Sequence, residues 1–236
     1  MSAILFGSIG TIADTSELQR QAFNQAFAKH NLDWQWHRDD YISMLEKSGG
    51  KQRIEDYAKS LGQSVDAQAI HSSKSAIFQQ LLQTETIEPR PGVLEVVKQA
   101  EQQGIKLALV TTTSAQNVAS ILKAMEKTLL AEKFDIIMDK SDVSAGKPSA
   151  EPYLFAVQRL GERTEDCVAI EDNLDGVRAA ESARLGCVAF PNCNTAHHNF
   201  ESANICTNAL RFEQLKRLVS NQQRQYAQSG LHLVRS

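Results

Sequence analysis

Short runs of continuously apolar residues alternate with amphipathic stretches through most of this chain. The apolar runs cover residues 4–6, 105–111, 134–138, 167–170 and 186–190. Stretches with helical periodicity lie between and after them, at residues 93–103, 114–127, 151–160, 176–183 and 213–226. Strands without polar alternation are typical of a parallel sheet that is covered by helices on both faces. The pattern therefore predicts an α/β fold built from β-α-β units.

A purely helical segment interrupts this pattern after the first strand. Its apolar positions follow helical spacing and predict helices at residues 17–30, 34–46, 51–60 and 65–84. The sequence Pro-Arg-Pro-Gly at residues 89–92 ends the segment, because two prolines and a glycine cannot continue a helix. We expect a helical domain at residues 16–85, inserted into an α/β domain made of residues 1–15 and 86–236.

The composition excludes several classes of function. Of the 236 residues, 42% are hydrophobic and 22% are charged, which is ordinary for a globular protein. The formal net charge is −3, so the charge balance favours neither nucleic acid nor an anionic membrane as a partner. No apolar run approaches the roughly 20 residues that a membrane-spanning helix needs. The N-terminus leads directly into a core strand without a signal-peptide pattern, which indicates a cytoplasmic protein.

The cysteines predict no disulfide framework. Cys167 and Cys187 lie within apolar strand-like runs, which is typical of buried free thiols in a reducing compartment. Cys193 lies close in sequence to His197 and His198, and these three residues could form one corner of a metal site. The segment offers no second cysteine pair at zinc spacing, so we favour free thiols.

Polar side chains that could handle phosphate follow several predicted strands. Thr111 and Thr112 end the second apolar run, Lys147 precedes a helix, and Glu171 with Asp172 follows the fourth run. Ligands bind beyond the carboxyl ends of the strands in an open parallel sheet. Hydroxyl and ammonium groups can hold phosphate oxygens, and two adjacent carboxylates can hold Mg²⁺. Taken singly, such a threonine can also cap a helix, and such an acidic pair can complement a helix dipole.

The end of the first strand lacks the residues that such a site needs. The sequence there is Gly7-Ser8-Ile9-Gly10-Thr11. Neither glycine nor isoleucine can attack phosphorus, transfer a proton or bind a cation through its side chain. An isoleucine at this place can instead extend the apolar core and close the pocket.

Two phrases at the strand ends carry a resemblance to a known superfamily. Residues 146–153 have the pattern Gly-Lys-Pro-x-x-x-x-Tyr, and residues 171–180 have the pattern Glu-Asp-Asn-x-x-Gly-x-x-Ala-Ala. The patterns and their order resemble the haloacid-dehalogenase-like (HAD) superfamily, and the similarity covers residues 4–212. Within it, the chain looks like the β-phosphoglucomutase group, and more narrowly like its branch of CbbY-type sugar-phosphate phosphatases. The segments that carry this narrower resemblance are residues 20–24, 48–54 and 90–93.

The resemblance implies a Rossmannoid parallel-sheet core with an inserted four-helix cap domain of the C1 type. In that family pattern, Thr111 would hydrogen-bond the transferring phosphoryl group, with Thr112 beside it. Lys147 would neutralise the charges of the phosphoryl group and the nucleophile. Glu171 and Asp172 would anchor Mg²⁺.

On the cap side, the resemblance implies groups that approach the substrate. Lys51 and Arg53 would reach the sugar or a second phosphate, and Glu17 would lie on the same side. An exposed basic turn on the cap surface is the alternative for the two cations. Gln19 stands where this branch usually has a histidine.

The first motif departs from the family pattern. The nucleophilic aspartate of the family falls on Gly7, and its acid–base aspartate falls on Ile9. Losing a covalent nucleophile costs on the order of 10⁶ in rate in other enzymes, and losing general acid–base catalysis costs roughly 10²–10⁴ more. Ser8 and Asp14 are near in sequence but do not fall at the position for in-line attack. We predict that Lys147 turns inward and pairs with one of the two adjacent acidic residues of the fourth run.

These observations predict a catalytically degenerate CbbY-like HAD protein. We expect a non-catalytic binding, regulatory or assembly protein, with a phosphorylated sugar or a protein as its partner. No cofactor is expected, and Mg²⁺ binding would be weak because the first carboxylate is missing. The alternative is a Mg²⁺-dependent sugar-phosphate phosphatase, a phosphoric monoester hydrolase with residual or altered activity.

Overall fold

A six-stranded parallel sheet forms the centre of the computed structural model, which describes residues 1–47, 49–129 and 131–233. In spatial order the strands are β3 (Ile136–Met138), β2 (Lys106–Val110), β1 (Ala3–Phe6), β4 (Cys167–Glu171), β5 (Gly186–Ala189) and β6 (Ile205–Cys206). The predicted α/β fold with a parallel sheet is confirmed. The sequence pattern does not predict β6, because two residues at a sheet edge carry too little apolar signal.

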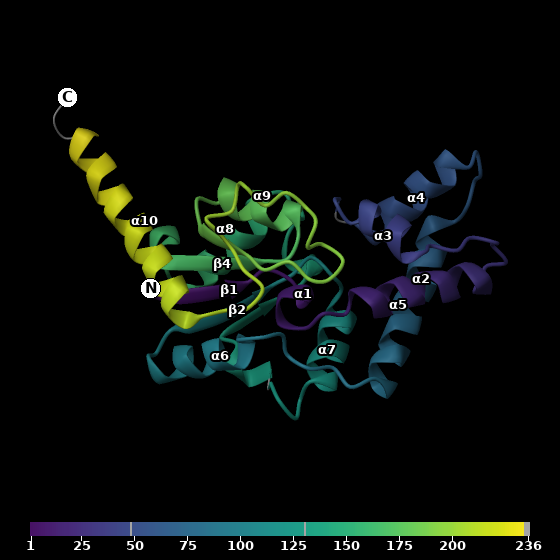
Figure 1. Cartoon of the computed structure of the whole chain (residues 1–236), viewed down its shortest axis with the longest axis horizontal. Helices are drawn as coiled ribbons and strands as arrows, with labels where there is room; N and C mark the ends of the chain where they lie inside the picture. The colour runs from purple at the N-terminus through teal and green to yellow at the C-terminus, as the bar shows by residue number, and fades with distance from the viewer. Residues whose placement is uncertain (48, 130, 234–236) are drawn as a thin grey trace.

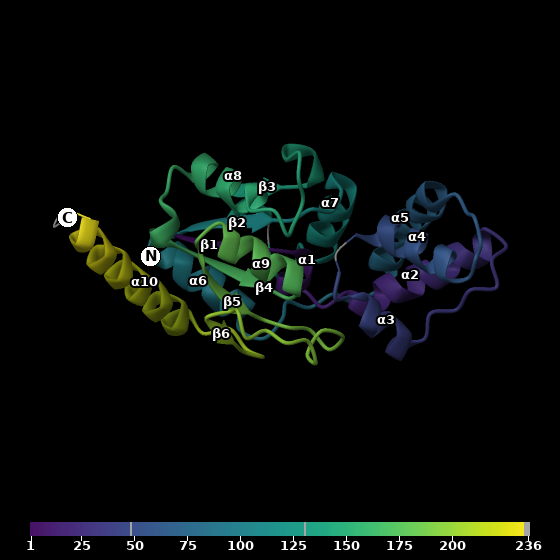
Figure 2. The same cartoon turned by 90° about the horizontal axis from the view of Figure 1, so that it is seen from above.

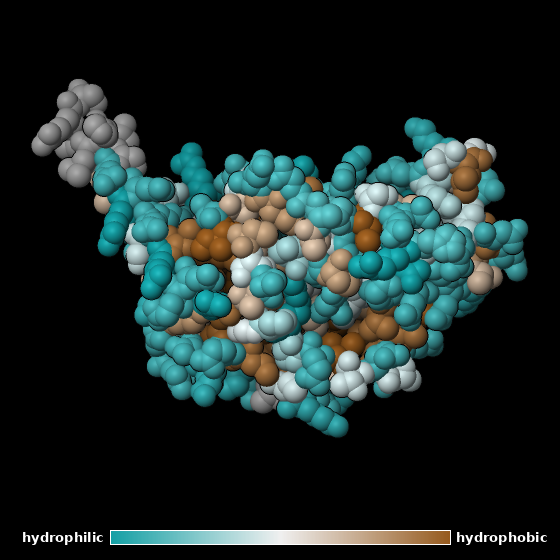
Figure 3. Space-filling view, viewed as in Figure 1, coloured by the Kyte–Doolittle hydropathy of each residue, from teal (hydrophilic) through white to brown (hydrophobic). Residues whose placement is uncertain are grey.

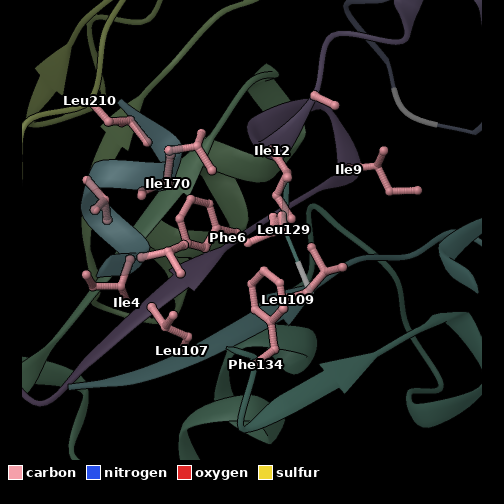
Figure 4. Packing of buried hydrophobic residues seen from close by; sticks show 14 of the residues in the cluster. Ile4, Phe6, Ile9, Ile12, Leu107, Leu109, Leu129, Phe134, Ile170 and Leu210 are labelled. Carbon is pink, nitrogen blue, oxygen red and sulfur yellow. The ribbon is translucent and has the colours of Figure 1, made fainter. Parts of the chain in front are cut away.

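Helices cover both faces of the sheet (Figures 1 and 2). Alternate residues of β1 point to opposite faces: Ile4 and Phe6 pack in one apolar cluster, and Ala3 and Leu5 pack in the other. The first cluster lies under α6 (Val93–Gln102), α7 (Ala115–Ala124) and α10 (Phe212–Leu233), and the second lies under α8 (Glu151–Leu160) and α9 (Leu174–Ser182). Figure 4 shows the first cluster around Phe6. Burial on both faces explains why the strands lack polar alternation.

Short helical turns connect these elements. They are α1 (Ile9–Ile12), directly after the first strand, and the 3₁₀ segments η1 (Ala131–Lys133), η2 (Lys140–Asp142) and η3 (Thr164–Asp166). Parallel strands all end at one edge of the sheet, so the residues after β1, β2 and β4 are brought together there.

A four-helix bundle, called the cap here, lies beyond that edge of the sheet (Figures 1 and 2). Its helices are α2 (Ser16–Lys29), α3 (Arg38–Met44), α4 (Gly50–Ser60) and α5 (Ala67–Thr84). Aromatic side chains dominate its apolar cluster, and they include Phe23, Phe27, Trp34, Trp36 and Tyr41. Aromatic rings bury a large area each and so stabilise a small helical bundle.

The predicted helix over residues 34–46 is wrong at its start, because α3 begins only at Arg38. Trp34 and Trp36 lie in an irregular segment whose rings fill the cap cluster. Asn24 of α2 fixes this segment: its Oδ1 accepts from the Trp36 backbone N at 2.9 Å, and its Nδ2 donates to the Trp36 carbonyl oxygen at 3.0 Å. The apolar spacing of the two tryptophans therefore reflects side-chain burial from a loop.

Helix α5 packs in both parts of the molecule. Ile70, near its start, belongs to the aromatic cluster of the cap. Phe78 and Leu82, further along, belong to the core cluster beneath α6 and α7. The division of the chain at residues 16–85 therefore remains a proposal, since the last turns of α5 bury their apolar side chains against the core.

The surface seen in Figure 3 is mainly hydrophilic, with smaller hydrophobic areas over both the sheet and the cap. In the described ranges, no helix combines the length and the hydropathy that crossing a bilayer requires. All four cysteines are free thiols, and Cys167 and Cys187 are buried as predicted.

Candidate active site

The first strand ends in the middle of the sheet, at the place where chemistry is expected. β1 lies between β2 and β4, and the Gly7 backbone N–H continues the ladder by donating to the Ile170 carbonyl oxygen at 2.8 Å. The Gly7 carbonyl oxygen accepts a hydrogen bond from the Lys147 ammonium group. Ser8 then caps α1, since its hydroxyl oxygen accepts from the Thr11 backbone N. The backbone arrangement is thus that of a strand-to-helix turn with no side chain at its first position.

The space that a side chain at position 7 would need is filled by other residues. A Cβ atom placed on Gly7 would overlap the carboxylate of Glu171 and the hydroxyl of Tyr153. These two groups bind each other, with the Tyr153 hydroxyl donating to Glu171 Oε1 at 2.6 Å. Both side chains are fully buried. A longer side chain at position 7 would therefore require both groups to move.

Lys147 is directed inward and is fully paired, as the sequence predicts. Its Nζ lies 2.6 Å from Glu171 Oε1 and donates at 2.8 Å to the Val110 carbonyl oxygen, in addition to the Gly7 carbonyl. The side chain is only 4% exposed, and the ammonium group lies 4.7 Å from the centre of the Tyr153 ring. All three ammonium protons thus have acceptors within the protein.

Burial dominates the protonation of this cluster. It raises the pKa of the Glu171 carboxyl, against the opposing attraction of Lys147, and it raises the pKa of Tyr153 well above its usual value with help from the Glu171 charge. A buried ion pair of this kind depends on both partners, because either charge alone would be left without water or a counter-ion.

Asp172 is also committed to donors within the protein. Its Oδ1 accepts from the Ser8 hydroxyl and from Asn173 Nδ2, both at 2.8 Å, and its Oδ2 accepts from Asn192 Nδ2 at 3.2 Å. A Cβ on Gly10 would overlap this carboxylate, so the glycine provides the room for it. The Ser8 hydroxyl is therefore used as a donor to Asp172.

The side chains present do not fit a magnesium ion. The resemblance implies Glu171 and Asp172 as ligands, but Lys147 neutralises the first, and three side-chain donors occupy the second. Within the described residues, no three His, Cys, Asp or Glu side chains come together in a group that could hold a metal. Of the four carboxylate oxygens, only Glu171 Oε2 lacks a hydrogen-bond partner in the described part of the chain. Mg²⁺ demands nearly octahedral oxygen coordination and gives up its waters reluctantly, so one such oxygen is a poor site.

Ile9 lies at the start of α1 and is buried, with 6% of its surface exposed. It belongs to the core cluster, where Figure 4 places it at the rim, apart from Phe6 and Leu109. Ser8 and Asp14 are the two nearby residues that could take the place of a side-chain nucleophile, and Ser8 is engaged as described above. Asp14 accepts from the Ser16 hydroxyl at 2.6 Å and from the Cys193 backbone N at 3.3 Å.

The hydroxyl side chains after β2 are in place. Thr111 is buried, and its Oγ1 accepts from the Thr113 backbone N at 3.2 Å. Because that contact uses a lone pair, the hydroxyl proton of Thr111 stays available to a ligand oxygen. Thr112 is half-buried and faces the loop that carries Lys147, close to Gly146. The structure therefore brings Thr111 and Thr112, at the end of β2, together with Lys147 from the loop before α8.

The three predicted cap residues, Arg53, Lys51 and Glu17, have different surroundings. Arg53 points into the cap itself: it donates to the carbonyl oxygens of Met44 at 3.0 Å and Lys47 at 2.8 Å, and it lies over the Tyr41 ring. The family-based expectation that Arg53 reaches a ligand is therefore not supported by its position. Lys51 is half-exposed and forms an i,i+4 pair with a glutamate at 3.5 Å.

Glu17 holds the cap against a core loop. Its Oε2 accepts from Arg20 Nε at 2.9 Å within α2. Its Oε1 accepts from Asn194 Nδ2 at 2.9 Å, and Arg38 of α3 donates to Asn194 Oδ1 at 3.1 Å and to the Cys193 carbonyl oxygen at 3.0 Å. Glu17 is thus part of the contact between the cap and residues 193–194.

Sequence reasoning misses a buried lysine in the cap. Lys74 of α5 is 3% exposed and donates to Oε1 of Gln19, the residue at the usual histidine position. Its Nζ lies 4.9 Å from the ring centres of both Phe23 and Phe78. Burial lowers the pKa of Lys74 to about 7. The available signal was its position in the apolar stripe of α5, where every fourth residue is buried.

Positive charge gathers where the cap faces the core. His71 lies on α5, three residues before Lys74. Its pKa is lowered to about 4, first by burial and then by four cations. These cations are Lys74, Lys140, Arg53 and Lys51, and Lys140 comes from the core segment η2. Lys51 is paired with Glu55 of its own helix, whereas Lys74 has a neutral amide as its partner. An anion is the group that would balance this cluster.

Arg90 joins three loops at the same edge of the sheet. It is buried, and its Nη1 donates to the carbonyl oxygens of Gly10 and Phe190, both at 2.7 Å, while Nη2 donates to the Pro191 carbonyl oxygen at 2.5 Å. The guanidinium group stacks over the Phe190 ring at 3.5 Å. The arginine that follows the helical segment therefore fixes the loops around the site.

Residues 1–184 match the family model described as haloacid dehalogenase-like hydrolase. The chain belongs to this family. The matched residues include the cap and the strands β1 to β4, and Thr111, Lys147 and Glu171 lie within them.

The relatives place the chain among the CbbY-like phosphatases of the family. It is 38% identical to Protein CbbY from Cereibacter sphaeroides over 206 residues, covering 86% of this chain and 90% of the relative. It is similar to the crystal structure of CbbY from Rhodobacter sphaeroides in complex with phosphate, with a TM-score of 0.81, 36% identity and coverage of 89% and 94% of the two chains. A mutant of that protein in complex with xylulose-(1,5)bisphosphate matches with the same scores. A β-phosphoglucomutase structure from Clostridium difficile, 19% identical with a TM-score of 0.77, shares the fold.

Proposed function

We propose that this chain is a non-catalytic CbbY-like protein that binds a phosphorylated sugar without hydrolysing it. The observation that carries the proposal is the filled space at Gly7, where the Glu171 carboxylate and the Tyr153 hydroxyl occupy the room for a nucleophile. Glu171 itself is fully buried and paired, so it cannot approach a phosphorus atom from that place. The absent acid–base group at Ile9 adds to the loss.

Several features support retained binding of a phosphate-bearing ligand. Thr111 keeps a hydroxyl proton free at the strand end. Four cations act on His71, of which Lys51 is paired with Glu55 and Lys74 has only a neutral amide as its partner. The CbbY relative was crystallised with phosphate and, as a mutant, with xylulose-(1,5)bisphosphate. A sugar bisphosphate carries two anionic groups and so matches a site with one polar side on the core and one cationic side on the cap. A regulatory or assembly role through such binding is part of the same proposal.

Calorimetry with xylulose-1,5-bisphosphate, combined with an assay for released phosphate, tests the proposal. We expect saturable binding and no phosphate release above that of a blank, with or without Mg²⁺. Lys51→Met should weaken binding about tenfold, since a hydrogen bond to a charged group contributes about 1.5–3 kcal/mol. Lys59→Met is the matched control, because Lys59 lies at the exposed other end of the same helix.

Absence of binding would contradict the proposal that the protein binds a phosphorylated sugar, and it would favour a protein partner. Equal effects of the two lysine substitutions would show that general charge attraction, and not a site at the cap, governs binding. Phosphate release by the unmodified protein would instead favour the alternative of a phosphatase with altered chemistry.

A further inference from the structure

A chain of side-chain hydrogen bonds runs from the cap to the strand end that carries Thr111. It begins at Gln79 of α5, whose Nε2 donates to Asn117 Oδ1 of α7 at 2.9 Å. Asn117 is 5% exposed, so neither its oxygen nor its nitrogen has ready access to water. This contact is the first step of a connection between two parts of the molecule that are far apart in sequence.

Asn117 passes the connection to the loop after β2. Its Nδ2 donates to Thr113 Oγ1 at 3.1 Å, and the Thr113 backbone N donates to Thr111 Oγ1 at 3.2 Å. The amide of Asn117 is thus used at both ends, once toward the cap and once toward the loop. A buried amide that loses either partner must rotate or leave a polar group unsatisfied.

The helices that carry these residues are packed against each other. Helices α5 and α7 lie side by side in Figures 1 and 2. Phe78 and Leu82 of α5 share the core cluster with Val118 and Ile121 of α7. Gln79 is held between the two apolar residues of its own helix, so its amide follows any displacement of α5 against α7.

We propose that Gln79 and Asn117 are positioning residues that couple the cap helix α5 to the Thr111–Ser114 loop. In the native arrangement, Asn117 holds Thr113 so that its backbone N–H occupies one lone pair of Thr111 and orients the hydroxyl proton outward. A ligand that draws the cap closer shifts α5, and the shift reaches Thr111 through this chain. The ligand side of the inference rests on the proposed function, because a phosphoryl group is the ligand expected at Thr111.

Amide hydrogen exchange of the ligand-free protein tests the coupling without requiring a ligand. Gln79→Ala removes the donor to Asn117, and we expect the Thr113 amide to exchange about tenfold faster, since a local opening becomes easier there. Gln80→Ala is the matched control: it removes the same residue type from the next, exposed position of the same helix and should leave exchange unchanged. The double substitution Gln79→Lys with Asn117→Asp replaces the amide contact by an ion pair and should restore slow exchange.

A second arm measures the affinity for xylulose-1,5-bisphosphate. Gln79→Ala should weaken binding about fivefold, which lies within the usual range of coupling between sites, while Gln80→Ala should not. Unchanged exchange at Thr113 in Gln79→Ala, or equal acceleration by Gln80→Ala, would overturn the coupling. If the unmodified protein binds no bisphosphate, the proposed function fails, and the exchange arm still decides the coupling.

Discussion

The core and the cap differ in how the charges that face each other are balanced. On the core side, Lys147 and Glu171 neutralise each other, and Asp172 is satisfied by side-chain donors. On the cap side, Lys74 has a neutral amide as its partner, and four cations lower the pKa of His71. The core therefore needs no anion, whereas the cap still favours one.

This difference separates two properties that an active phosphatase needs together. A catalytic centre requires charged groups that are free to act on a substrate, and here they are bound to one another. Ligand recognition requires only a cluster of complementary charge, which the cap retains. The proposed function therefore joins a core without catalytic chemistry to a cap that favours an anion.

The largest expected effect comes from separating the buried pair of the core. Lys147→Met leaves the Glu171 carboxyl without its counter-ion, and breaking such a pair typically costs about 3–5 kcal/mol of unfolding free energy. The double substitution Lys147→Met with Glu171→Leu removes both charges and should come within about 1 kcal/mol of the unmodified protein. Urea denaturation measures both. Equal destabilisation by the single and double substitutions would contradict the assignment of a self-neutralised centre.

The cap lysine should make stability depend on pH. The pKa of Lys74 is lowered from 10.5 to about 7 by burial, so between these values the unfolded chain binds a proton that the folded chain does not. Stability therefore rises as the pH increases from about 7 toward 10.5, and below about pH 7 this dependence levels off because both states bind the proton. We expect a rise of about 3 kcal/mol between pH 7 and pH 9.5 that Lys74→Met abolishes.

Denaturation curves at the two pH values, for the unmodified protein, Lys74→Met and Lys59→Met, provide the measurement. Lys59 is exposed, so its substitution should preserve the rise. If Lys74→Met keeps the full pH dependence, Lys74 is charged in the folded protein at neutral pH. The positive charge of the cap is then better balanced within the protein than we propose.

The smallest effect is expected where the two sides touch at the rim. Arg38 binds Asn194 and the Cys193 carbonyl oxygen, but half of its side chain is exposed. Arg38→Ala should cost only about 0.5–1 kcal/mol of unfolding free energy, because exposed polar contacts contribute little. A loss above about 2 kcal/mol in urea denaturation would show that this contact, and not the packing of α5, holds the cap in place.

The strand ends were predictable from the sequence because parallel strands bring their carboxyl ends to one edge. From this rule we expect Thr111, Lys147 and Glu171 to lie near one another. Because Gly7 has no carboxylate to pair with Lys147, we also expect Lys147 to turn inward. The aromatic cap cluster was harder to predict. Trp34 and Trp36 have apolar spacing that suits a helix, but they are buried from a loop that Asn24 fixes through long-range hydrogen bonds.

The sequence spacing of the cap cations does not show which way each side chain points. Lys51 and Arg53 are two residues apart in one helix, so they point to different sides of it, and the packing over Tyr41 decides which. The occupation of the Gly7 space by Glu171 and Tyr153 is likewise a tertiary effect, since the three residues come from separate elements. Lys74 was visible as a cation within an apolar stripe, but its burial depends on how α5 packs on α2.

The central claim is that the filled space at Gly7 prevents catalysis by this protein, as the proposed function requires. The direct test is phosphate release from xylulose-1,5-bisphosphate with Mg²⁺ by a triple variant, Gly7→Asp with Ile9→Asp and Tyr153→Phe. It restores both carboxylates and removes the Tyr153 hydroxyl, one of the two groups that a Cβ at position 7 would overlap, so that only the Glu171 carboxylate has to shift. The matched control carries only Ile9→Asp and Tyr153→Phe. We predict turnover by the triple variant alone, at least about 10⁴-fold above the control. Turnover by the unmodified protein would contradict the account.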